Sequence, residues 1–72
     1  MTAEDRDLIR AAAAERLVKV GHEFDLDYIE VDRATRQRIL DLIADGLLFV
    51  VDLTDAVRRP VKPTDKAGQV LP

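Results

Sequence analysis

The stretch Phe24-Asp25-Leu26-Asp27-Tyr28-Ile29-Glu30-Val31 determines the fold class, because it fits two different elements. Up to Tyr28 its apolar residues alternate with aspartates, which is the period of a half-buried strand. The alternation breaks at residues 29–31, where a strand would need a bulge. Asp27 and Glu30 also have the spacing of a capping box, which starts a helix. We therefore favour a helix that begins near Tyr28.

The residues that follow support this helix. Val31, Thr35, Ile39 and Leu42 recur at intervals of three and four residues, so a helix would place them on one face. Asp45-Gly46 is a typical helix end, since glycine readily adopts the left-handed conformation that is needed there. The pattern predicts a helix over about residues 28–45, with a candidate break near residue 32.

The N-terminal segment predicts another helix. Thr2 can accept a hydrogen bond from the backbone N–H of Asp5 and so cap the start of this helix. Residues 11–14 are alanines, the strongest helix formers, and Gly21 is a suitable stop. We expect this helix over about residues 3–20.

A continuous apolar run follows Gly46 and consists of Leu47, Leu48, Phe49, Val50 and Val51. A short run of this kind, bounded by glycine and aspartate, fits a buried strand. Residues 57–61 could pair back on it as a hairpin, or residues 53–59 could form a last short helix, and the sequence leaves both open. Residues 60–72 contain all three prolines of the chain and show no periodicity, which predicts a disordered tail.

These segments predict a mostly α fold, with α+β as the alternative. Two main helices would be followed by a short strand or hairpin and by a disordered C-terminal tail. We expect one small globular domain over residues 1–59 and a flexible, basic, proline-containing tail over residues 60–72. Residues 1–57 carry seven basic and thirteen acidic side chains, against four and one in residues 58–72. The acidic body would repel nucleic acid, whereas the basic end could reach a phosphate or an acidic surface.

The composition predicts a protein that binds rather than catalyses. The chain has 72 residues, no cysteine and a single histidine, so neither a disulfide nor a zinc site is expected. His22 follows a glycine at the expected end of the first helix, where it would contact the last carbonyls. The acidic residues between 23 and 32 lack the ligand pattern of a calcium-binding loop. We expect no catalytic residue, no metal, no cofactor and no small-molecule substrate.

Size and hydropathy bear on location and assembly. A chain this short usually needs self-association or a protein partner to supplement its hydrophobic core. The N-terminus is acidic, unlike a signal peptide, and the longest apolar run is too short to cross a bilayer. A cytoplasmic protein without a membrane partner is therefore expected.

The basic residues suggest a second kind of partner. Arg33, Arg36 and Arg38 lie on the expected second helix, and such side chains contact phosphates and base edges in DNA-binding proteins. Residues 31–48 resemble the recognition helix and following strand of winged helix-turn-helix regulators. That resemblance implies a wing at residues 52–59, with Arg58 and Arg59 beside the DNA backbone. The helix and turn that should precede Val31 are missing, and a solvated helix face is the simpler interpretation.

The leading hypothesis is a small non-catalytic regulatory or adaptor protein, for example a modulator of transcription machinery or of another enzyme. It would bind its partner through the apolar run at residues 47–51, with the arginines as rim contacts. The alternatives are a degenerate winged-helix DNA-binding regulator and a small structural subunit of a larger assembly. An adaptor should expose an apolar patch rimmed by charge, whereas a DNA binder should gather Arg33, Arg36, Arg58 and Arg59 on one face.

Overall fold

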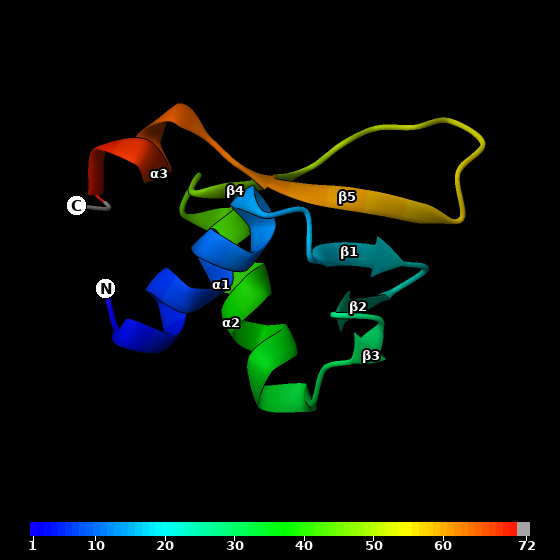
Figure 1. Ribbon diagram of the computed structural model, residues 1–72, viewed down its shortest axis with the longest axis horizontal. Coiled ribbons are helices and arrows are strands. Elements are labelled where there is room, and N and C mark those ends of the chain that lie inside the picture. Colours follow the sequence, from blue (N-terminus) through cyan, green and yellow to red (C-terminus); the bar gives the residue numbers. More distant parts are fainter. Residues whose placement is uncertain (71–72) are drawn as a thin grey trace.

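The computed structural model describes residues 1–70 and shows an α+β fold (Figure 1). Its strands form one antiparallel sheet in the order β3-β2-β1-β5-β4. The prediction of a mostly α fold is therefore wrong. The elements in chain order are α1 Ala3–Ala13, β1 Leu17–Val20, β2 Glu23–Leu26, β3 Ile29–Glu30, α2 Arg33–Ala44, β4 Leu48–Val50, β5 Arg58–Pro63 and α3 Asp65–Val70.

The first difference from expectation lies in residues 24–31, which form strands instead of the start of a helix. Asp27 and Tyr28 have φ values of 54° and 70°, so the chain reverses in a tight turn between β2 and β3. Helix α2 begins later, at Arg33, and is capped by Asp32, whose carboxylate accepts a hydrogen bond from the Thr35 N–H over 2.8 Å. The alternating pattern prevails because β1 lies beside β2 and supplies its hydrogen bonds, with Leu17 opposite Leu26.

The second difference is the early end of α1, at Ala13 rather than near residue 20. The predicted cap is confirmed, because Thr2 accepts a hydrogen bond from the Asp5 N–H over 3.1 Å. At the other end Glu15 has a φ of 62°, and the Arg16 N–H donates to the Ala11 carbonyl over 2.9 Å. This is a Schellman motif that uses glutamate where glycine is usual. Because no glycine stands at this position, the residue pattern does not predict a helix end here.

The third difference is at the C-terminus, where the predicted disordered tail is wrong. Residues 58–63 form β5, which crosses the expected boundary at residue 59, and α3 follows it. Val61 is fully buried, and so is Ala67 of α3. The sheet tolerates Pro60 because its missing N–H costs one bond, while its carbonyl accepts from the Val51 N–H over 2.9 Å. Residues 71–72 of the predicted tail lie outside the described residues.

Several predictions for the middle of the chain are confirmed. Helix α2 ends at Ala44, and Gly46 follows with a φ of 77°. The apolar run after it contains β4, and β5 pairs with this strand. Of the two alternatives for the following residues, the hairpin is therefore correct and the short helix is not. The hairpin connection, residues 51–57, is the long arched loop at the far end of the molecule from both termini (Figure 1).

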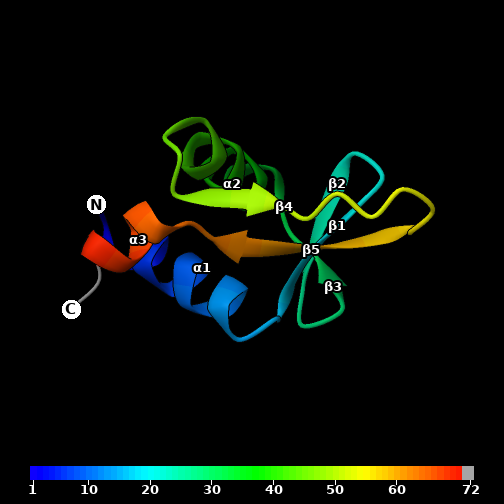
Figure 2. The same cartoon turned by 90° about the horizontal axis from the view of Figure 1, so that it is seen from above.

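The hydrophobic core lies on one face of the sheet. Figure 1 shows α1 and α2 on the same side of β4 and β5, and Figure 2 shows β5 running between these two helices. Leu17, Phe24 and Val61 of the sheet are fully buried against Ile9 of α1 and Ile39 of α2. Within the described residues, the opposite face carries no helix. None of the helices within residues 1–70 is long and apolar enough to cross a membrane.

Candidate functional site

The uncovered face of the sheet, here called the outer face, has an apolar centre. The strand register places Val18 of β1 opposite Pro60 of β5, on the side away from the buried Leu17 and Val61. Val20 lies two residues further along β1 on the same face, and Val18, Val20 and Pro60 are all partly exposed. Phe49 of β4, which lies opposite Lys62, is on the same face at the sheet edge and is 45% exposed. A helix-free sheet face with these side chains can take a partner of matching apolar character.

Charged residues surround this apolar centre. Arg58 donates to Asp25 over 3.1 Å across the face. Lys62, which lies opposite Phe49 in the register, donates to Glu15 over 3.1 Å. Each of these cations is neutralised by a carboxylate, so the rim is polar but carries little excess charge. The arrangement is an apolar patch with a charged rim.

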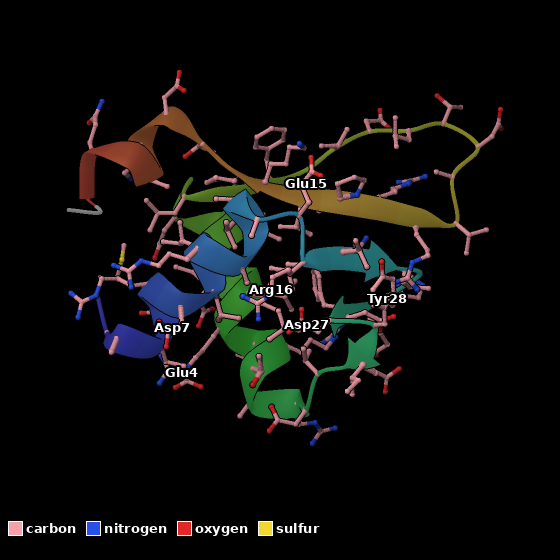
Figure 3. The ribbon with its side chains drawn as sticks, viewed as in Figure 1. Glu4, Asp7, Glu15, Arg16, Asp27 and Tyr28 are labelled. Atoms are coloured by element: carbon pink, nitrogen blue, oxygen red, sulfur yellow. The ribbon has the colours of Figure 1, made fainter. Side chains whose placement is uncertain are left out.

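One corner of the outer face holds a strained, exposed tyrosine (Figure 3). Tyr28 is 87% exposed and has a φ of 70°, a conformation that bulky residues rarely adopt. The guanidinium of Arg58 lies 5.4 Å from the centre of its ring, within range of a cation–π contact. Arg16 binds both carboxylate oxygens of Asp27, and its hydrogen bond lowers the pKa of that carboxyl. These contacts hold an aromatic side chain out in solvent, as is common in recognition surfaces.

Strand β4 forms one edge of the sheet, and part of its backbone has no hydrogen-bond partner within residues 1–70. The Val51 N–H donates to Pro60, and the Leu47 carbonyl accepts from the Thr64 N–H, so these residues face β5. Because backbone groups alternate in direction along an antiparallel strand, the N–H and C=O groups of Leu48 and Val50 point to the open side. The strand sequence contains no lysine and no proline, two residue types that commonly protect sheet edges.

The apolar run that the sequence singled out is therefore divided between core and surface. Leu47 and Leu48 are buried, with exposures of 7% and 2%, and cannot serve as free contact residues. Val50 and Val51 are half-buried, and Phe49 is the exposed member. Sequence reasoning missed Val18, Val20 and Pro60, because alternation in a strand shows that it has two faces but not which of them stays uncovered.

The arginines that suggested DNA binding do not form one positive face. Arg36 donates to the His22 carbonyl over 3.1 Å, and Arg38 forms an ion pair with Asp5 over 3.1 Å. Arg58 and Arg59 are consecutive in β5 and point to opposite faces of the sheet. Arg33, in the first turn of α2, is exposed and has no ion pair within residues 1–70.

The elements around α2 also differ from those of a helix-turn-helix. Strands β1, β2 and β3 precede α2, so the first helix and turn of such a unit are not formed there. The predicted contact of His22 with a helix end is wrong as well, because this residue is exposed in the turn between β1 and β2.

No group of histidines, aspartates and glutamates in the described chain gathers three side chains that could hold a metal ion. Comparison with known proteins gives no relative, since no family model, curated protein or solved structure matches the chain. Function is therefore inferred from the surface chemistry of this chain alone.

Proposed function

We propose that this protein is a non-catalytic binding module of the adaptor or regulatory kind, which takes up an extended segment of another protein as an added strand beside β4. The observation that carries the proposal is the free edge of β4, where Leu48 and Val50 offer unpaired backbone groups next to the exposed Phe49. A partner strand would satisfy these groups, as in other cases of strand addition.

Side chains of the partner strand would determine specificity. Successive residues of a strand point to opposite faces of the sheet. The partner residue beside Phe49 would therefore lie on the outer face and pack against its ring, because both belong to the same side of the extended sheet. We expect an apolar residue at that position, since cross-strand aromatic and aliphatic pairs stabilise a sheet by about 0.2–1 kcal/mol.

The rim would contribute to the rate of association rather than to its strength. Arg58 and Lys62 are exposed and already paired with carboxylates, so a partner gains little by approaching them. Because β4 has only three residues, the edge offers few backbone bonds. A transient complex with a small interface fits this geometry better than an obligate one.

The experiment measures amide hydrogen exchange in the presence of extended peptides selected from a displayed library. The edge amides of Leu48 and Val50 should exchange rapidly in the free protein and become protected when a selected peptide binds. The Val51 amide should be protected in both states, because it already donates to Pro60. Unchanged exchange at the two edge amides in a saturated complex would contradict strand addition.

A pair of variants provides the control. Phe49→Glu places a carboxylate opposite Lys62, a favourable cross-strand pair that should leave the fold intact. It should also abolish peptide binding, because a charge then occupies the apolar contact. Ile29→Glu changes a residue that is 72% exposed at the opposite edge, in β3, and should leave binding unaffected. Equal losses in both variants would argue against β4 as the binding edge.

A further inference from the structure

Two basic residues lie directly opposite each other on neighbouring strands. Lys19 of β1 and Arg59 of β5 are register partners, and both point to the helix-bearing face of the sheet. Both residues are partly buried. Neither forms an ion pair within residues 1–70, whereas Arg58, the neighbour of Arg59 in sequence, is bound to Asp25.

These two side chains line a hollow of about 290 Å³. The turn between β1 and β2 contributes Gly21 and His22 to its wall, and the loop between β4 and β5 contributes Ala56 and Val57. The lining contains no acidic residue. The position of the turn is held by Arg36, which donates to the His22 carbonyl over 3.1 Å.

The opposition of Lys19 and Arg59 has an electrostatic cost. A second like-charged register pair, Asp25 and Glu30, is relieved by Arg58, which donates to Asp25 over 3.1 Å. Like charges directly opposite each other on neighbouring strands destabilise a sheet. The chain has 14 acidic and 11 basic side chains, so carboxylates are plentiful, yet none is placed between Lys19 and Arg59. Partial burial also reduces the screening of these charges by water. An anion bound between the two groups would remove the repulsion and gain two charge-assisted hydrogen bonds.

We propose that this hollow is a binding site for a phosphate group. The planar guanidinium of Arg59 suits two-point contact with phosphate oxygens, and the Lys19 ammonium adds a second cation from the neighbouring strand. The volume is at the lower end for ligand sites and accommodates a phosphate group or a small phosphate monoester. Inorganic phosphate and a small phosphate monoester share this chemistry. The site lies on the face opposite the Val18 and Pro60 patch and goes beyond the proposed strand addition.

The experiment is a titration of the whole chain, followed by amide chemical shifts. The two probes are inorganic phosphate and glycerol phosphate, and chloride at equal ionic strength is the control. Saturable shifts at Lys19, Gly21, His22 and Arg59, with a dissociation constant of about 1 mM or tighter, are expected for at least one probe. Tighter binding of inorganic phosphate identifies the free ion as the ligand, and tighter binding of glycerol phosphate identifies a monoester. Shifts that do not saturate with either probe, or that chloride reproduces, would overturn the proposal.

Variants test the residues directly. Lys19→Gln and Arg59→Gln should each weaken phosphate binding by about tenfold or more, because each removes a charged hydrogen-bond donor. Both should remain folded, since each relieves a repulsion. Lys19→Arg keeps the charge and should keep binding. Arg33→Gln removes an exposed arginine outside the hollow and should change nothing. If Arg33→Gln weakens binding as much as Arg59→Gln does, the protein has a general attraction for anions and no specific site.

Discussion

Arg16 and Asp27 form a two-point ion pair, in which Nε donates to Oδ1 and Nη2 donates to Oδ2, each over 2.7 Å. The Asp27 N–H also donates to the Arg16 carbonyl over 3.0 Å. Backbone and side chain thus close the β1–β2 hairpin at its open end, beside the strained turn that holds Tyr28. An exposed pair normally contributes little to stability, but two parallel bonds give this one a defined geometry.

The pair predicts a pH dependence for the turn. The hydrogen bond from Arg16 lowers the pKa of Asp27 below its ordinary value of 3.8. The carboxylate therefore stabilises the folded state above that value, and this contribution is lost as the pH falls through the lowered pKa. Arg16→Gln should return the Asp27 carboxyl to a pKa near its ordinary value, as followed by NMR titration. An unchanged titration in the variant would show that Arg16 is not the cause.

The left-handed end of α1 predicts a stabilising substitution. Glu15 has a φ of 62°, a conformation that is unfavourable for any residue with a Cβ atom. Glu15→Gly should raise the free energy of unfolding by about 0.5–1 kcal/mol, because glycine adopts this conformation freely. The substitution also removes the exposed ion pair between Glu15 and Lys62, which contributes little to stability. Urea denaturation measures the change.

The adjacent residue provides the control for this substitution. Ala14 has a φ of −85°, where glycine gains nothing. Ala14→Gly should lower the free energy of unfolding by about 0.5–1 kcal/mol, because glycine loses more backbone entropy on folding. The same sign of change in both variants would show that the conformation of residue 15 is not the cause.

The capping role of Asp32 at the start of α2 predicts different effects of alanine and asparagine at this position. Its carboxylate accepts a hydrogen bond from the Thr35 N–H over 2.8 Å, and hydrogen bonding by the side chain and backbone of Thr35 lowers its pKa. Asp32→Ala should lower the thermal unfolding midpoint. Asp32→Asn should change the midpoint little, because asparagine is an equally good cap. The stabilisation by Asp32 should also disappear in acid, as the pH falls through the lowered pKa. If Asp32→Ala has the same unfolding midpoint as the unsubstituted protein at neutral pH, Asp32 does not stabilise α2 as a cap.

The dispersed arginines predict weak binding to DNA. Arg36, Arg38 and Arg58 are engaged by carbonyl or carboxylate groups of the chain itself. Labelled duplex at two salt concentrations should therefore show no binding tighter than the nonspecific range, with a dissociation constant of about 10⁻⁴–10⁻⁶ M. Tight, sequence-selective binding that falls steeply with salt would support a DNA-binding regulator instead.

Elements whose signals are local could be predicted from the sequence alone. The Thr2 cap, the stop at Asp45-Gly46 and the apolar strand after it depend on residues within a few positions of one another. A capping hydrogen bond or a left-handed glycine satisfies groups of the same turn, so it can be recognised without knowledge of the rest of the fold.

The tertiary structure alone determined which segments became a sheet and which face of it stayed open. Phe24 lies in a strand because β1 runs beside it, and Pro60 is held in the sheet by Val51 and by β1. Lys19 and Arg59, which face each other on neighbouring strands, are forty positions apart in the sequence. The hydrogen bonds of a strand are made with segments that are distant in the sequence. The local residue pattern therefore does not show which segment will pair with the strand.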